Sequence, residues 1–186
     1  MANARRGAHL LTIGHSTLPL EAFLRILQAH GVERLADVRT IPRPRHNPQF
    51  NRETLPAALE TAGIRYTHLS GLGGLRHARR DSVNTGWRNT SFRGYADYMQ
   101  TPEFEENLQT LMNLAEKERV AIMCAEAVPF RCHRSLIADA LSVRGVRVEH
   151  VRSLEKRDPH AITPFARVEG TRITYPGLVG PEAASS

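Results

Sequence analysis

Short apolar runs alternate with stretches of helical spacing along most of the chain. Five runs predict β-strands, at residues 9–13, 34–38, 64–69, 120–124 and 146–151. Apolar positions three and four residues apart predict helices between them, at about residues 18–30, 52–61, 95–99, 101–115 and 134–144. Strands that alternate with helices are typical of a parallel sheet with right-handed crossovers and helices on both faces. We therefore expect an α/β fold with a mostly parallel sheet of four to five strands.

The C-terminal part departs from this alternation. The pattern around Glu169-Gly170 predicts a small C-terminal hairpin. Residues 77–93 have no apolar period and predict a long surface loop or lid, and a loop of that length inside a compact domain is usually functional. We expect one α/β domain over residues 9–176, with disordered ends at residues 1–8 and 177–186.

Residues 119–141 carry the strongest signal for a functional site. The strand at 120–124 is apolar at every position, which is typical of a strand buried on both faces. The end of this strand and the loop behind it hold both cysteines of the chain and several other reactive groups: Cys124, Glu126, Cys132, His133 and Arg134. A loop between a parallel strand and a helix lies at the carboxyl edge of the sheet, where α/β proteins bind ligands and a helix N-terminus attracts anions.

Polar clusters also occur at the ends of the other predicted strands. They are His15 and Ser16 after the first strand, Asp37 and Arg39 at the end of the second, and Gly73, Gly74 and Arg76 after the third. Because the carboxyl ends of parallel strands meet at one edge, we expect these groups to line one pocket with residues 124–134. Arg45, in a basic and proline-rich loop at 40–51, is expected to bind substrate at the same place.

Cys132 is the candidate nucleophile, with His133 beside it as a further catalytic candidate. We expect Cys132 to be partly exposed near the first turn of a helix, where the helix dipole, His133 and Arg134 would stabilise its thiolate. The alternative is a cysteine that only packs. Cys124 ends an apolar strand, and we expect it to be a buried core residue. The chain contains no cofactor motif, so no bound cofactor is expected.

Acid–base roles fall to the remaining groups. Glu126 is a candidate acid or base, or else forms a salt bridge with a nearby arginine. His15 is a candidate base, with Ser16 as a hydrogen-bonding partner of the substrate, or His15 only caps the following helix. Asp37 and Arg39 are two residues apart on a strand, so they share a face and either serve the pocket or pair with each other.

Three further groups could bind a phosphate. Arg134, in the first helical turn, could hold an oxyanion together with adjacent backbone N–H groups. The turn Gly73-Gly74, followed by Arg76, could cradle a phosphate, although an ordinary turn has the same composition.

Basic residues are concentrated in one third of the chain. The 186 residues have a formal net charge of +6, and residues 34–93 contain eleven arginines against four acidic residues, a local net charge of +7. A basic segment of this kind is typical of phosphate or nucleic-acid contact, with a merely solvated surface as an equal alternative. No apolar run approaches the ~20 residues of a membrane span, so no membrane partner is expected. Two cysteines without an export signal indicate reduced thiols and a cytoplasmic location.

Several short motifs together resemble the domain of unknown function 488 family over about residues 9–176. They are TIGHS (12–16), ADVR (36–39), RHNPQFN (45–51), LGGLR (72–76), FRGYADYM (92–99), MCAE with CHR (123–134) and RITYP (172–176). The resemblance implies an α/β domain and does not supply a reaction. It marks as the site His15, Asp37, Arg39, Cys124, Glu126, Cys132, His133 and Arg134.

The sequence therefore predicts an enzyme whose pocket at the carboxyl edge binds an anionic substrate. The substrate is expected to bear phosphate and to be a small molecule, a nucleotide or a nucleic acid. Two alternatives stay open. One is a nucleic-acid-binding module in which the same groups only bind, and the other is a metal-binding protein that uses Cys124, Cys132 and His133. The sequence does not indicate an oligomeric state.

Overall fold

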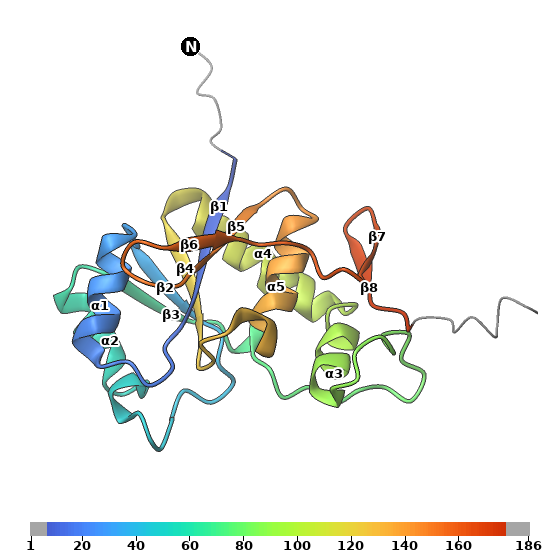
Figure 1. The fold of residues 1–186 in the computed structure, drawn as a ribbon, viewed down its shortest axis with the longest axis horizontal. Helices are drawn as coiled ribbons and strands as arrows, with labels where there is room; N and C mark the ends of the chain where they lie inside the picture. Colours follow the sequence, from blue (N-terminus) through green and yellow to red (C-terminus); the bar gives the residue numbers. More distant parts are fainter. Residues whose placement is uncertain (1–6, 178–186) are drawn as a thin grey trace, which may run out of the picture.

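The computed structural model describes residues 7–177 and shows an α/β fold (Figure 1). A six-stranded sheet has the strand order β3-β2-β4-β1-β5-β6. Its strands are β1 (His9–Gly14), β2 (Arg34–Asp37), β3 (Arg65–His68), β4 (Val120–Cys124), β5 (Arg147–Val151) and β6 (Arg157–Pro159). The first five strands run parallel, and β6 pairs antiparallel with β5 at one edge. The predicted mostly parallel sheet is confirmed. Strand β6 is an additional strand, which its three polar or proline residues did not indicate.

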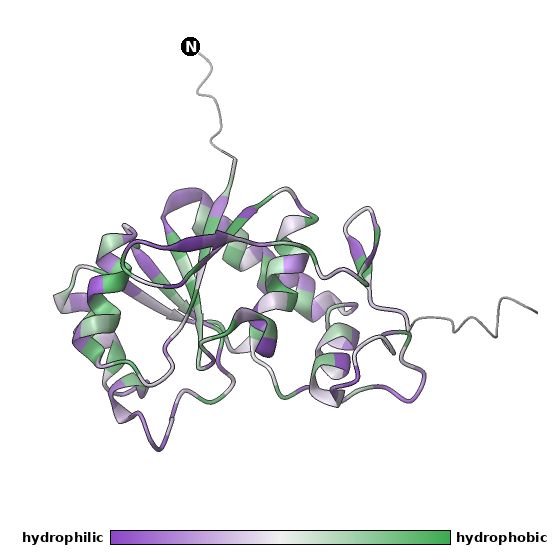
Figure 2. Cartoon of the chain, in the orientation of Figure 1, coloured by the Kyte–Doolittle hydropathy of each residue, from purple (hydrophilic) through white to green (hydrophobic). Residues whose placement is uncertain are grey.

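Helices cover both faces of the sheet. They are α1 (Leu20–Ala29), α2 (Leu55–Thr61), α3 (Thr90–Tyr98), α4 (Pro102–Lys117) and α5 (Arg134–Ser142). Helices α1 and α2 pack on one face, and α3, α4 and α5 pack on the other side (Figure 1). Strand β4 separates the two cores: Ile122 and Cys124 belong to the core with α5, whereas Ala121 and Met123 belong to the core with α1 and α2. All five β4 residues are buried, as the apolar run predicted. The strand has the green of hydrophobic residues in Figure 2.

The C-terminal segment forms the predicted hairpin and then returns to the body of the protein. Strands β7 (Arg167–Glu169) and β8 (Arg172–Thr174) pair around Gly170, which has φ 63°. Tyr175 behind the hairpin is fully buried, and its hydroxyl donates to a carboxylate oxygen of Asp139 on α5 (2.8 Å). This contact attaches the end of the described chain to α5, the helix that follows β4 and its loop.

The expected long loop at 77–93 ends earlier than the sequence pattern predicts. Helix α3 begins at Thr90, because the Asn89 side chain accepts hydrogen bonds from the N–H groups of Ser91 (2.8 Å) and Phe92 (3.3 Å). The loop is also pinned from inside: Asn84 is fully buried, and its amide nitrogen donates to a carboxylate oxygen of Asp97 (2.7 Å). The segment is therefore built into the fold on the α3 side.

The expected disordered ends fall mainly outside the described residues. Three residues of those ends are described, Gly7, Ala8 and Gly177. Two of them make a hydrogen bond: the Ala8 carbonyl accepts from Arg147 N–H (2.8 Å), and Gly177 N–H donates to the Thr85 hydroxyl (3.0 Å). Three short 3-10 helices complete the fold, η1 (Pro48–Phe50), η2 (Ser70–Leu72) and η3 (Pro129–Arg131).

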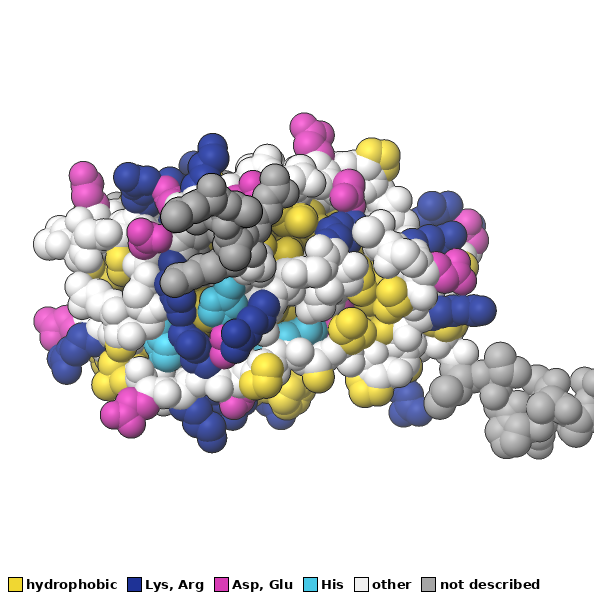
Figure 3. Space-filling view, turned by 90° about the horizontal axis from the view of Figure 1, so that it is seen from above, with side chains coloured by type: hydrophobic (Ala, Val, Ile, Leu, Met, Phe, Trp, Pro, Cys, Tyr) yellow, Lys and Arg dark blue, Asp and Glu magenta, His cyan; other side chains and the backbone are white. Residues whose placement is uncertain are grey.

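Charges of both signs are interspersed on the face seen from above (Figure 3). Ion pairs also connect β5 and β6. The Glu149 carboxylate of β5, for example, lies 3.4 Å from the guanidinium nitrogens of both Arg147 and Arg157. In the described part of the chain, no helix is both long enough and apolar enough to cross a membrane.

Candidate functional site

The carboxyl ends of four strands meet at one edge of the sheet. Gly14 of β1 pairs with Cys124 of β4, and Asp37 of β2 pairs with His68 of β3. The loops after β1 and β4 then continue side by side, because His15 N–H donates to the Cys124 carbonyl (3.0 Å). Groups that are far apart in the sequence therefore converge at this edge, as parallel topology requires.

Gly14 allows the loop after β4 to lie directly against β1. A Cβ atom at Gly14 would lie only 1.7 Å from the carbonyl oxygen of Glu126 and 3.0 Å from the Cα atom of Ala127, so no larger residue fits without a shift of the backbone. Ser16, two residues on, has φ 47°, in the left-handed region that costs energy for a residue with a side chain. Its N–H donates to the Ala125 carbonyl (2.9 Å), which holds this conformation in place.

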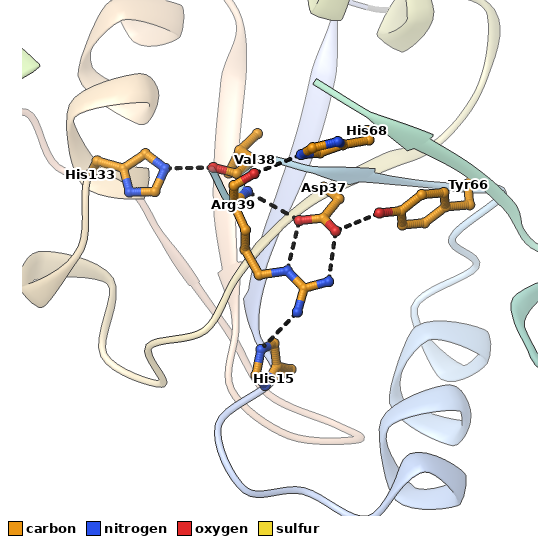
Figure 4. Close-up of polar contacts among 7 residues, drawn as sticks. All are labelled: His15, Asp37, Val38, Arg39, Tyr66, His68 and His133. Carbon is orange, nitrogen blue, oxygen red and sulfur yellow. Dashed lines mark hydrogen bonds and ion pairs between the residues drawn. The ribbon is translucent and has the colours of Figure 1, made fainter. Parts of the chain in front are cut away.

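Asp37 and Arg39 pair with each other beneath the site (Figure 4). Arg39 Nε donates to Asp37 Oδ1 (2.9 Å), and Arg39 Nη2 donates to Asp37 Oδ2 (2.7 Å). The Tyr66 hydroxyl donates to the same Oδ2 atom (2.6 Å), and burial together with this carboxylate raises the pKa of Tyr66. Asp37 is fully buried and Arg39 is 6% exposed. Of the two alternatives for Asp37 and Arg39, the structure shows the pairing.

His15 is held as a neutral hydrogen-bond acceptor toward Arg39. Its Nδ1 atom lies 2.8 Å from the Ser16 carbonyl and therefore carries the hydrogen, which leaves Nε2 to accept from Arg39 Nη1 (3.3 Å). The ring stacks on Phe50 with 4.3 Å between centroids. Burial lowers the pKa of His15, and the Arg39 guanidinium acts in the same direction. A neutral imidazole at this position is able to accept a proton.

A cleft of about 420 Å³ opens at this edge of the sheet. Six of the residues selected from the sequence line it, together with Cys124: His15, Arg39, Gly74, Glu126, Cys132 and His133. We call its buried and half-buried polar members the cleft floor: His15, Arg39, Cys124, Cys132 and His133. Apolar groups form much of the wall: Ile41, Pro44, Leu75, Phe92 and Tyr95. A few polar groups in an otherwise apolar concavity are typical of a small-molecule site.

Two further arginines line the cleft: Arg43, which belongs to the basic segment expected to contact an anion, and Arg131, which the sequence did not indicate. Both are exposed. Arg43 forms an ion pair with Glu53 (2.7 Å), whereas Arg131 forms none with any residue between 7 and 177. Both arginines lie close in sequence to a residue that the sequence assigned to the site, Arg45 or Cys132. Which of several neighbouring loop residues faces the cleft depends on the conformation of the loop.

Six selected residues do not line the cleft: Ser16, Asp37, Arg45, Gly73, Arg76 and Arg134. Arg45 is exposed on the proline-rich loop. Arg76 turns back on its own segment: its Nε donates to the Gly73 carbonyl (3.2 Å), and its guanidinium lies 3.7 Å from the centre of the Tyr98 ring. Gly73 packs so closely against Thr40 that a Cβ atom would lie 2.5 Å from the threonine hydroxyl oxygen. Of the expected phosphate cradle, Gly74 therefore lines the cleft, whereas Gly73 and Arg76 do not.

Arg134 is buried, which corrects the expectation that it faces an oxyanion. It is 1% exposed, and its Nη2 donates to the carbonyls of Glu126 (3.1 Å) and Ala127 (3.2 Å). Its Nε has no hydrogen-bond partner within residues 7–177, and no carboxylate there forms an ion pair with it. Arg134 therefore braces the loop after β4 and places an uncompensated positive charge behind the cleft floor.

The two cysteines are free and buried, with 2% exposure for Cys124 and 6% for Cys132. The expected core position of Cys124 is confirmed. The expectation of a partly exposed Cys132 with a stabilised thiolate is wrong, because contact with Cys124 and burial raise the pKa of Cys132 well above its ordinary value. Contact with the Cys132 thiol lowers the pKa of Cys124, and the charge of Arg134 acts in the same direction. Cys124 is thus the more acidic thiol.

His133 is oriented to accept a proton from Cys132. His133 Nε2 lies 2.8 Å from the Val38 carbonyl and carries the hydrogen (Figure 4). Its Nδ1 lone pair therefore faces Cys132 Sγ at 3.5 Å. Burial lowers the pKa of His133 to about 4, which keeps the ring neutral at neutral pH. A thiol, a neutral imidazole and an orienting acceptor form the usual arrangement of an activated nucleophile.

Glu126 is exposed, and its carboxylate forms no ion pair within the described residues, so the alternative of a salt bridge is not observed. Metal binding also lacks support: in residues 7–177, no group of three or more His, Cys, Asp or Glu side chains could hold an ion. The alternative site of Cys124, Cys132 and His133 therefore has no basis in the geometry.

A second hollow, of about 450 Å³, lies between α4, α5 and the β7–β8 hairpin. Its charged lining includes Glu105 and Arg144, which form an ion pair with each other. The hollow contains neither cysteine nor histidine, whereas the cleft holds both cysteines and the side chains of His15 and His133.

Comparison with known proteins adds a family match. The model of the family described as "Domain of unknown function DUF488" matches residues 19–141. The matched region begins just after His15 and includes every other member of the cleft floor. No curated protein and no solved structure matches the chain.

Proposed function

The chain belongs to the DUF488 family, a domain of unknown function, and from this premise and the cleft we propose that it is an enzyme that binds an anionic, phosphate-bearing substrate. The observation that carries the proposal is the convergence of three arginines with two thiols and two imidazoles around one cleft. Free, reduced thiols suit the cytoplasm, where we place the protein.

The charges around the cleft favour an anion. Arg39 is already neutralised by Asp37, and Arg43 shares its charge with Glu53, so Arg131 is the arginine of the lining without an acidic partner in the described chain. The one acidic side chain in the lining is Glu126. A phosphate group held by Arg131 and Arg43 would gain charge-assisted hydrogen bonds.

The apolar wall narrows the substrate class. Phe92 is a half-buried aromatic residue of the lining that also contains Arg43 and Arg131, and Ile41 and Leu75 are exposed by 67% and 73%. Aromatic side chains next to basic groups bind nucleotides and single strands by stacking on the bases. We therefore propose a nucleotide, or the end of a nucleic acid, as the substrate.

The cleft floor supplies groups for catalysis. His15 and His133 are neutral and accept hydrogen bonds, and the thiols of Cys124 and Cys132 lie at the two ends of the loop after β4. We propose that the thiols provide the nucleophile, that the two imidazoles act as bases, and that the exposed carboxylate of Glu126 acts as acid or base.

Binding is tested by fluorescence anisotropy with a labelled mononucleotide and a labelled single-stranded oligonucleotide. The Arg131→Ala variant should lose about tenfold in affinity, since a hydrogen bond to a charged group contributes about 1.5–3 kcal/mol. Arg25→Ala is the control, because Arg25 is exposed on α1 outside the cleft. Equal affinities of the R131A and R25A variants, or no binding of either probe at low salt, would refute the proposal.

A binding module without catalysis is the second candidate, and the basic segment at 34–93 favours it. The Glu126→Gln variant separates the two. Removal of a negative charge beside a bound phosphate should tighten binding in both cases, whereas turnover of the bound nucleotide or oligonucleotide should fall only if Glu126 takes part in catalysis. Product formation is followed by mass spectrometry of the incubated ligand.

A further inference from the structure

The two cysteines of the cleft floor have a chemistry that ligand binding does not use. We propose that Cys124 and Cys132 form a redox-active dithiol, which reduces a low-molecular-weight disulfide that enters the cleft. The proposal goes beyond the proposed function and does not depend on anion binding.

The first support is the charge behind the thiols. Arg134 is almost completely buried, its Nε is unpartnered, and no carboxylate in the described chain forms an ion pair with it. Its Nη2 and the Cys124 thiol both donate to the Glu126 carbonyl oxygen, at 3.1 and 3.5 Å, so the guanidinium and the sulfur are neighbours. An uncompensated buried charge is costly, so this site favours a negative charge nearby, and a thiolate at Cys124 supplies it.

The second support is the proton acceptor beside the other thiol. His133 Nδ1 faces Cys132 Sγ, and the Val38 carbonyl fixes this tautomer. The backbone N–H of Arg134 also points at Cys132 Sγ (3.4 Å), and would stabilise a developing thiolate there at the start of α5. Each cysteine thus has its own partner for the charge that forms on its sulfur.

The third support is access. Both cysteines line the cleft of about 420 Å³, although little of either side chain is exposed. Their surroundings in the lining include the apolar residues Leu75 and Tyr95. A small, uncharged disulfide fits such a space, whereas a folded protein does not reach buried sulfur atoms.

The reaction has two thiol–disulfide exchange steps. In the first, the Cys124 thiolate attacks one sulfur of the small disulfide, a mixed disulfide forms at Cys124, and the other half leaves as a thiolate. In the second, Cys132 gives its proton to His133 Nδ1 and attacks the Cys124 sulfur. The internal Cys124–Cys132 bond forms, and the second half leaves as a thiolate that takes up the proton. Two electrons pass to the small disulfide, and a small dithiol returns the protein to its reduced form.

The experiment exposes the full-length reduced protein to hydroxyethyl disulfide and follows the intact mass and the alkylation of each cysteine. We expect the wild-type protein to lose the mass of two hydrogens and to resist alkylation. The Cys132→Ser variant should retain a mixed disulfide at Cys124. The Cys124→Ser variant should form its adduct more slowly than the Cys132→Ser variant, because the pKa of Cys124 is lowered whereas that of Cys132 is raised.

Two results would overturn the proposal: no internal disulfide in the wild-type protein, or equal adduct rates in the two single variants. If a serine variant does not fold, rapid quenching of the wild-type reaction still shows which cysteine carries the first adduct. The Cys124→Ser/Cys132→Ser double variant is the blank, because the chain contains no other cysteine. Nucleotide binding by this double variant tests the proposed function separately, and R25A, a change outside the cleft, should keep the wild-type thiol reaction.

Discussion

Arg39 holds both carboxylate oxygens of Asp37, at 2.9 Å through Nε and 2.7 Å through Nη2. This bidentate pair fixes the plane of the guanidinium and leaves Nη1 for His15, 3.3 Å away. The pair is buried at the end of β2, so its geometry sets the position of the whole cleft floor on that side. A fork of this kind cannot be replaced by lysine without loss of the second hydrogen bond.

The Asp37→Asn variant should be strongly destabilised. Asparagine keeps the shape of the side chain but leaves the buried Arg39 charge unpaired, and removal of one partner of a buried pair costs about 3–5 kcal/mol. Urea unfolding measures the loss. Asp81→Asn is the matched control, because Asp81 pairs with Arg79 at 3.0 Å on the surface, with both side chains at least 70% exposed. That change should cost less than about 1 kcal/mol, and equal losses in the two variants would contradict the argument.

The Gly14→Ala variant should displace the loop after β4. The added methyl group would lie 1.7 Å from the Glu126 carbonyl oxygen, which also receives the Arg134 hydrogen bond. We expect a loss of about 1–3 kcal/mol in unfolding free energy, typical of overpacking, together with weaker nucleotide binding. Gly7→Ala is the control, since nothing lies within 4 Å of a Cβ atom at that position. A wild-type unfolding curve for G14A would show that the loop moves away without cost.

The sequence was sufficient to predict the strands and the edge of the sheet at which their carboxyl ends meet. An apolar run such as 120–124 has a single low-energy environment, a strand covered on both faces, and parallel topology then brings the strand ends together. The positions of His15, Arg39 and Cys132 in one cleft follow from that topology alone. The hairpin at Gly170 was equally local, because its turn depends on one residue with positive φ.

The sequence did not predict which side chains near the loops point into the cleft and which point into the core. Arg131 ends η3 and Arg134 begins α5, three residues apart, yet Arg134 is buried behind the loop after β4 and Arg131 lines the cleft. The choice depends on which carbonyls the folded loop presents, and no local pattern encodes that. The contact between Cys124 and Cys132 has the same origin, and it reversed the expected order of thiol acidity. Strand β6 was missed because an edge strand of three residues needs only a partner, not an apolar period.

Replacement of Asp139 by alanine should release the C-terminal segment. Its carboxylate accepts hydrogen bonds from His160 Nε2 (2.7 Å), the Thr163 hydroxyl (2.7 Å) and the Tyr175 hydroxyl (2.8 Å). Without it the fully buried Tyr175 hydroxyl and the half-buried His160 and Thr163 groups lose their acceptor, which costs up to about 1–3 kcal/mol for a buried donor. We expect limited proteolysis to cleave between residues 160 and 175 in this variant. The Tyr175→Phe variant removes one donor without leaving one unpaired, so it should cost only about 1 kcal/mol and resist cleavage. Similar protease resistance in D139A and the wild-type protein would show that other contacts hold the segment.

Stability should fall on acidification because two buried histidines must stay neutral. His150 is 7% exposed; its Nδ1 accepts from the Thr12 hydroxyl (2.6 Å), and its Nε2 donates to His160 (2.8 Å). Burial lowers the pKa of His150 to about 3, with a further contribution from His160, and burial lowers that of His133 to about 4.

The unfolded chain takes up these protons near its ordinary pKa of about 6.5, whereas the folded chain does not. The unfolded state therefore binds more protons between about pH 3 and 6.5, so the unfolding free energy should rise with pH through that window and level off above it for these groups. The slope from each histidine is at most about 1.4 kcal/mol per pH unit.

The His150→Gln variant keeps an acceptor and a donor but does not titrate, so its slope between about pH 4 and 6 should be smaller than that of the wild-type protein. Urea unfolding across this range measures both slopes. His46→Gln, a change at an exposed loop position, controls for the substitution itself. Parallel curves for H150Q and the wild-type protein would mean that His150 is protonated in the folded state, against the hydrogen bonds that surround it.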